Sequence, residues 1–152
     1  MTTRERCQLA KERGFSYCPV SGEIKSVRGN VITTKTKGYT MVQLIIEGKR
    51  YYICAHRLAW FLHYGTLPIN SIDHIDGNRS NNRIDNLRDV TQQQNTFNQT
   101  TAKGYCWHKK NNKFQALIGI NGKRKHLGYY TTEQEARNAY LKAKEIYHVI
   151  NA

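Results

Sequence analysis

Acidic residues are scarce in this chain, and the features of a secreted or membrane protein are missing. Aspartate and glutamate total 11, whereas lysine and arginine total 24, which gives a formal net charge of +13. No apolar run approaches the length that spans a bilayer, and the charged segment 2–13 does not resemble a signal peptide. We therefore expect a soluble, intracellular protein with no membrane partner.

The cysteines lack the spacing of a metal site or of a disulfide framework. Cys7, Cys18, Cys54 and Cys106 include no C-x₂-C pair. We expect four free thiols in a reducing compartment. A zinc site built from the first three cysteines and His56 is an alternative that the spacing supports poorly.

The excess of positive charge favours a polyanionic partner. Nucleic acid is the leading candidate, because basic side chains that neutralise phosphates release condensed counterions. The charge is unevenly distributed, since two basic segments, 1–72 and 101–148, flank a locally acidic segment at 73–95. A cation site that acts on a polyanion would need this arrangement, although solvated surface charge is an alternative. At 152 residues the chain can form one large or two small domains.

Short alternating segments in the first third of the chain predict a small antiparallel sheet. Turns that contain glycine, at 21–22, 29–30 and 48–49, separate the segments that favour strands. A short buried helix is predicted after the sheet, because 56–64 is largely apolar and Gly65 can end a helix. The expected strands are 23–26, 31–34, 39–47 and 50–54.

Segment 70–99 is rich in asparagine, aspartate and glutamine, and its pattern predicts a strand, a loop, a second strand and a helix. Thr91 and Gln94 match a capping box, so the helix is expected to begin at Thr91. Asn95 would then lie in the first turn or just beyond it. The polar residues that follow have no periodicity, and we place a linker there.

The last third of the chain predicts three strands followed by a helix. Turn signals stand at 111–112 and 121–122, and the Asn-Gly pair of the second favours a tight hairpin. Thr132 and Glu135 match a second capping box, and alanines and tyrosines then recur at helical spacing. We expect a three-stranded sheet backed by this helix, with strands at 105–109, 114–120 and 125–130.

The acidic segment holds the residues best suited to hydrolyse a phosphodiester bond. That reaction needs an oxygen ligand for a hard cation, an imidazole that can deprotonate water, and amides that hold both in place. Asp73 and His74 supply the first two, and Asn86 and Asn95 follow them. An aspartate beside a histidine can instead be ordinary turn chemistry, in which the carboxylate bonds a nearby backbone amide.

The order of these motifs resembles that of the HNH endonucleases, in particular the homing endonucleases of phages and group I introns. The resemblance covers roughly residues 15–98. It implies a ββα-metal finger at about 70–98 that holds one divalent cation, in a bacterial or phage-infected cell. The matching segments are 56–60, 72–78, 81–82, 85–87 and 91–95.

Carried over to these positions, the resemblance implies a role for each of four residues. His74 would be the general base that activates water, and Asn86 would brace the loop and orient the His74 ring. Asp73 and Asn95 would ligate one Mg²⁺ or Mn²⁺ ion on the scissile phosphate. Many HNH enzymes have a histidine where this chain has Asn95, and an amide oxygen suits a hard cation better than zinc.

Three further residues are candidates for a supporting position behind these four. Asp76 is the alternative to Asp73 as the cation ligand. His56 precedes a buried helix and is either a supporting or phosphate contact or, as we favour, a structural histidine. Asn82 is expected to build the loop between the strands rather than to contact the cation.

The C-terminal segment, roughly 103–147, is similar to the plant ethylene-response-factor DNA-binding domain. The matching segments are 104–107, 113–116, 127–132 and 135–140. The resemblance implies that the sheet enters the major groove of DNA while the helix packs behind it. Cys106 and Gly119 replace arginines that usually read bases there, so no sequence preference is carried over. The side chains expected to contact DNA are Trp107, Lys109, Lys110, Lys113, Gln115, Lys123, Arg124 and Lys125.

These expectations describe an α+β protein. Domain 1–98 would combine a small antiparallel sheet with the ββα-metal finger, and a linker at 99–103 would lead to domain 104–150, a three-stranded antiparallel sheet packed on one helix. The expected function is hydrolysis of double-stranded DNA by a metal-dependent endonuclease, without an evident obligate protein partner and compatible with a monomer. A non-catalytic, sequence-specific DNA-binding regulator and an RNA-processing protein are the alternatives.

Overall fold

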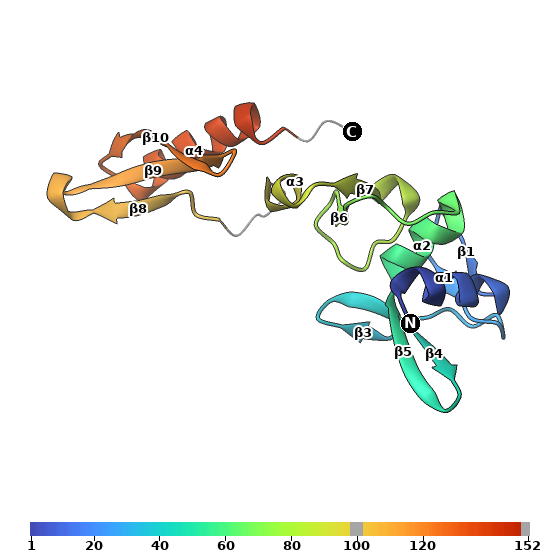
Figure 1. Ribbon diagram of the computed structural model, residues 1–152. Helices are drawn as coiled ribbons and strands as arrows, with labels where there is room; N and C mark the ends of the chain where they lie inside the picture. Colours follow the sequence, from blue (N-terminus) through green and yellow to red (C-terminus); the bar gives the residue numbers. More distant parts are fainter. Residues whose placement is uncertain (98–101, 150–152) are drawn as a thin grey trace. The chain divides into compact units, whose positions relative to one another are not determined.

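The chain forms two compact units in a computed structural model that describes residues 1–97 and 102–149 (Figure 1). The first unit is Met1–Val90 and the second is Thr91–Ala152. Most of the linker expected at 99–103 lies outside the described residues. Helices and small antiparallel sheets make up both units, so the predicted α+β class is confirmed.

The first unit contains two helices of ten residues and three small antiparallel sheets. The sheets pair β1 with β2, β3 with β4 and β5, and β6 with β7. The elements are α1 (Thr3–Glu12), β1 (Ser16–Tyr17), β2 (Ile24–Lys25), β3 (Lys35–Thr36), β4 (Tyr39–Ile46), β5 (Lys49–Cys54), α2 (Ala55–Tyr64), β6 (Ser71–His74), the 3₁₀ turn η1 (Ile84–Asn86) and β7 (Leu87–Val90).

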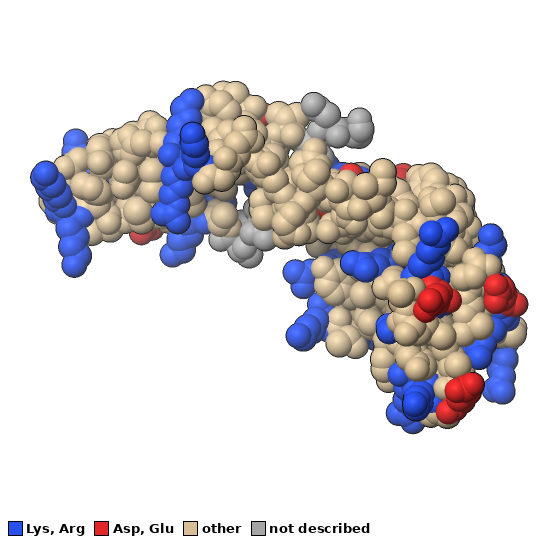
Figure 2. All heavy atoms as spheres, in the orientation of Figure 1, with Lys and Arg blue, Asp and Glu red and all other residues tan. Residues whose placement is uncertain are grey.

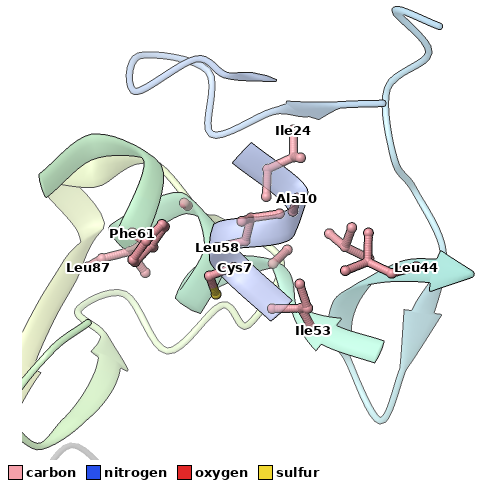
Figure 3. Close-up of a cluster of buried hydrophobic side chains, with 11 residues drawn as sticks. Cys7, Ala10, Ile24, Leu44, Ile53, Leu58, Phe61 and Leu87 are labelled. Carbon is pink, nitrogen blue, oxygen red and sulfur yellow. The ribbon is translucent and has the colours of Figure 1, made fainter. Parts of the chain in front are cut away.

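The core of this unit lies where α1 and α2 pack on each other and on the β4–β5 hairpin (Figure 3). Val42, Leu44 and Ile53 point inward from alternate positions of the two strands, as the period of a half-buried strand requires. Leu58 is fully buried on α2. This hydrophobic cluster supports the helix that immediately precedes β6 and thereby the base of the candidate site.

Two elements of this unit differ from the sequence-based expectations. Helix α1 was not predicted, although Thr2 and Glu5 form a complete capping box at its N-terminus. The strand expected at 31–34 is wrong, because only Val31 pairs there, in a single bridge to Lys25. The helix expected at 56–64 is confirmed as α2, which Gly65 ends with a left-handed φ of 76°.

The second unit begins with the short helix α3 and continues as a sheet in the order β10-β9-β8. Helix α4 packs on one face of this sheet, where Ile118, Tyr140 and Ala143 form the core (Figure 1). Asn121 and Gly122 both adopt positive φ, as a tight hairpin turn requires. The elements are α3 (Gln92–Phe97), β8 (Tyr105–His108), the 3₁₀ turn η2 (Lys109–Asn111), β9 (Lys113–Ile120), β10 (Lys123–Tyr130) and α4 (Glu133–Tyr147).

Both capping boxes predicted in this part of the chain are formed. Gln94 donates its backbone N–H to the Thr91 hydroxyl, and Glu135 does the same with Thr132. None of the helices among residues 1–97 and 102–149 combines the length and the apolar character that a bilayer crossing requires.

Candidate active site

The two residues at the end of β6 are an acid and an imidazole, and both are buried. Asp73 is 8% exposed and His74 is 4% exposed. Strand β7 pairs with β6 in antiparallel register, so that Arg88 lies opposite Asp73 and Leu87 lies opposite His74. A polar loop then joins the two strands. The hairpin thus brings both candidate residues to the edge of the hydrophobic core.

Asp73 forms an ion pair with Arg88. The guanidinium donates from Nη2 and from Nε to the same carboxylate oxygen, Oδ2, at 2.8 and 3.1 Å. When side-chain atoms alone are counted, Asp73 is 10% exposed and Arg88 is 20% exposed, so both are largely shielded from solvent. This charge-assisted pair fixes the direction of the Asp73 side chain. Arg88 was not among the predicted site residues, because its contact depends on the cross-strand register.

Asn82, through a hydrogen bond, and two aromatic neighbours contact the His74 ring. Its Nε2 lies 3.2 Å from Oδ1 of Asn82. The ring of His56 meets it edge-on, with 5.3 Å between the ring centroids, and the ring of Tyr39 is 6.1 Å away. His56, Asn82 and His74 were all predicted as site or supporting residues, and the structure brings the three together.

His56 is a neutral neighbour of His74. Burial lowers the pKa of His56 to about 3, and the nearby His74 and Arg57 contribute to the shift. The uncharged ring packs against Tyr39 as well as against His74. The structure thus places His56 in packing contact with both rings.

The low pKa of His56 leads to an expected dependence of stability on pH. Below about pH 6.5 the unfolded chain binds a proton at this histidine, whereas the folded chain does not until about pH 3. The free energy of unfolding should therefore fall as the pH is lowered through this window, by roughly 1 kcal/mol per pH unit from this residue. Urea unfolding at several pH values should show a shallower dependence for His56→Phe; identical curves would contradict the assignment.

The loop between β6 and β7 is braced by hydrogen bonds among three polar residues. Asn86 accepts from the Asp76 backbone N–H at 3.0 Å and donates to Asp76 Oδ1 and to the Asn81 carbonyl, both at 2.9 Å. Asn81 donates to the other oxygen of Asp76 at 2.7 Å. Hydrogen bonds, chiefly from the Asn81 side chain, lower the pKa of Asp76. Asp76 and Asn86 therefore act together as the internal frame of this loop.

The fourth predicted residue, Asn95, lies in the other unit. It belongs to α3, where its backbone N–H donates to the Thr91 carbonyl at 2.9 Å. The first unit accordingly contains Asp73, His74 and Asn86, and the second contains Asn95.

The chemistry of the available ligands fits a hard cation better than zinc. Asp73 offers carboxylate oxygen, which is a ligand that Mg²⁺ and Mn²⁺ accept. Within residues 1–97 and 102–149, no three His, Cys, Asp or Glu side chains are grouped so that they could hold a metal. The four cysteines are free thiols, as predicted, and the zinc alternative has no support in the described part of the chain.

The residues predicted to contact DNA divide between the two faces of the second unit's sheet. Gln115 lies opposite Cys106, and Arg124 lies opposite Gly119, on the face away from α4. Lys113 shares this outer face, whereas Lys109 and Lys110 are exposed in η2. The opposite face, which carries buried Ile118 and packs on α4, also carries Trp107, Lys123 and Lys125.

Lys125 is already engaged by α4. Its ammonium nitrogen lies 2.6 Å from the Tyr147 hydroxyl and 4.4 Å from the centre of that ring. The strongest candidates for a DNA contact are therefore the basic and polar residues of the outer face and of η2. Lysine and arginine greatly outnumber acidic residues on the visible surface of this unit (Figure 2).

Known proteins share the segment that contains this site. Residues 54–97 match the family model of the HNH endonucleases. The chain is 37% identical over 79 residues to an uncharacterized HNH endonuclease, L560, of Acanthamoeba polyphaga mimivirus, which covers 50% of this chain and 42% of that protein. It is 33% identical over 76 residues to Protein 3.8 of Escherichia phage T7, which covers 45% of this chain and 63% of that protein. The chain thus spans less than two thirds of either relative.

A solved structure is also similar, and it is described as DNA binding and cleavage by the HNH homing endonuclease I-HmuI. The sequences are 29% identical, the TM-score is 0.46, and the match covers 82% of this chain and 76% of the other. Residues 54–97 contain α2, β6, β7 and the buried Asp73–His74 pair. This segment is an HNH endonuclease domain.

Proposed function

We propose that the protein is a metal-dependent endonuclease that hydrolyses phosphodiester bonds in double-stranded DNA. The observation that carries the proposal is the buried Asp73–His74 pair at the end of β6, within the segment that matches the HNH endonucleases. An ordinary turn would not need a buried carboxylate that is paired with Arg88 and an imidazole that is enclosed by two other rings.

In this proposal, His74 takes the proton of the attacking water. Its enclosure by Tyr39, His56 and Asn82 fixes the direction of the ring before the substrate binds, which lowers the cost of reaching the reactive geometry. Asp73 would hold the cation from the first unit. A bound Mg²⁺ would offset the negative charge that develops on the phosphate and on the leaving oxygen.

In the same proposal, Arg88 has two partners, the Asp73 carboxylate and the phosphate of the substrate. Its guanidinium holds the Asp73 carboxylate in a fixed direction. A guanidinium also matches the geometry of a phosphate, so Arg88 can turn to the substrate once Asp73 has another partner. The hairpin would then supply both a cation ligand and a phosphate contact from opposite strands.

DNA is the proposed substrate because of the charge and the second unit. The net charge of +13 favours a polyanion, and the exposed face of the β8–β10 sheet presents Lys113, Gln115 and Arg124. We propose that this unit binds DNA in the manner of an ethylene-response-factor domain. Joining a binding unit to a cleaving unit raises the local concentration of substrate at the active site.

A plasmid-nicking assay tests the proposal directly. Supercoiled DNA should be converted to nicked or linear forms with Mg²⁺ or Mn²⁺, and excess EDTA should abolish the conversion. Electrophoretic mobility shifts in EDTA should still report DNA binding. Binding without cleavage under every divalent-metal condition would instead favour the non-catalytic regulator, and stronger competition by structured RNA would favour an RNA substrate.

A further inference from the structure

The hydrogen bond between Asn82 and His74 restricts the protonation of the imidazole. The atom of Asn82 that faces Nε2 is the amide oxygen Oδ1, at 3.2 Å, and an amide oxygen only accepts. The bond therefore requires a proton on Nε2. In the neutral ring, the lone pair is then on Nδ1. Asn82 is 4% exposed, so bulk water does not compete for this bond.

The backbone that carries Asn82 is held by the first hairpin of the chain. The Tyr17 hydroxyl donates to the Asn82 carbonyl at 2.7 Å, and the backbone N–H of Ile84 donates to the Pro19 carbonyl at 3.1 Å. Burial, with smaller contributions from neighbouring charges, raises the pKa of Tyr17 to about 12, so its hydroxyl stays protonated. Segment 17–22 thus contacts the chain on both sides of Arg83.

Gly22 makes the closest approach in this contact. A Cβ atom at Gly22 would lie 2.6 Å from the Arg83 nitrogen and 2.8 Å from the Asn82 carbonyl carbon, which is closer than atoms of this kind can come. Its φ of +76° is also one that side chains disfavour. Glycine is therefore required here by close backbone packing, and this packing fixes the position of Asn82.

We infer that Asn82 is the positioning residue for His74, and that segment 17–22 belongs to the active site because it holds Asn82. The inference rests on the proposed nuclease function. Asn86 was expected to orient the ring, but its amide is engaged with Asp76 and Asn81 as the frame of the loop. The two asparagines therefore have different roles. Asn86 stabilises the loop, and Asn82 orients the imidazole ring of His74.

Replacement of Asn82 by leucine tests the inference, because leucine has a similar size and no acceptor. Asn82→Leu should lower the single-turnover cleavage rate at saturating DNA by about 10- to 100-fold, with little change in DNA affinity. Asn82→Asp keeps an oxygen acceptor and should recover most of the rate. Asn70→Leu makes the same change at an exposed asparagine and is the matched control.

A second readout does not depend on cleavage. Nitrogen-15 spectra of the imidazole, recorded where the ring is neutral, should show the proton on Nε2 in the unaltered protein and a mixture of tautomers in Asn82→Leu. If no cleavage is detected for the unaltered protein, the nuclease proposal fails while these spectra still decide the role of Asn82. Unchanged tautomers together with an unchanged rate in Asn82→Leu would overturn the inference.

Tyr17→Phe tests the contribution of the β1–β2 hairpin to the position of Asn82. It also replaces Asn82→Leu as the test if that variant does not fold. It removes only the hydroxyl that holds the Asn82 carbonyl. The cleavage rate should fall a few-fold while circular dichroism and DNA affinity stay unchanged. A rate equal to that of the unaltered protein would remove segment 17–22 from the site.

Discussion

Replacing His74 with alanine is expected to lower the rate of DNA cleavage by about 10²- to 10⁴-fold while DNA affinity stays close to that of the unaltered protein. The expected loss is large because no other imidazole is available to take over. The neighbouring His56, whose ring centroid lies 5.3 Å from that of His74, is buried and has a pKa of about 3. DNA affinity should be retained because the basic surface that supplies it is unaffected by the change.

The measurement combines single-turnover cleavage with a binding assay in EDTA. His63→Ala is the matched control, because His63 is an exposed histidine at the end of α2 whose recorded ring contact is with Tyr64. Circular dichroism and thermal unfolding would verify that both variants are folded. A folded His74→Ala protein that loses binding and cleavage to the same degree would contradict the role of His74 as the base.

Gly104→Ala is expected to destabilise the second unit by about 3–5 kcal/mol, enough to unfold a unit of this size. A Cβ at this position, just before β8, would overlap the ring of Tyr140 on α4. The φ of +78° adds backbone strain. Tyr140 is buried in the core and cannot move aside without opening that core.

Gly122→Ala separates the two causes. Its φ of +74° is nearly the same, but a Cβ there would meet nothing within 4 Å, so it reports backbone strain alone, about 1 kcal/mol. Urea unfolding followed by Trp107 fluorescence in a Trp60→Phe background would measure both variants. Equal losses of stability would show that contact with Tyr140 is not the cause.

The elements that the sequence predicted well are those whose signals are local. Helices α2 and α4 have apolar periodicity and clear ends, and Asn121-Gly122 specifies its turn by backbone conformation alone. Segment 31–34 shows the opposite case. It has β-prone residues, but strand preference reflects a pleated, half-buried surface with a partner, and only Val31 is paired there.

The sequence indicated the residue types of the candidate site but not their contacts. The adjacent acid and histidine that it singled out, Asp73 and His74, both lie buried at the end of β6. Arg88 could not be identified, because its place opposite Asp73 depends on the register of β6 and β7. Asn82 reaches the imidazole only because the loop folds back, and such chain reversals leave no periodic signal. The faces of β9, by contrast, follow from counting alternate residues from Ile118, whereas β10 shifts its register between His126 and Gly128.

The four thiols differ in reactivity, and this difference makes the protein easy to label at chosen places. Burial raises the pKa of Cys7 to about 11, so alkylating reagents find little thiolate there. Cys18 is exposed, and hydrogen bonds from Ser21 lower its pKa, which makes it the preferred target for a maleimide dye. Cys106 is also exposed and lies on the outer face of the second unit's sheet. Each unit thus has an exposed sulfur, Cys18 in the first and Cys106 in the second, that a thiol reagent can reach.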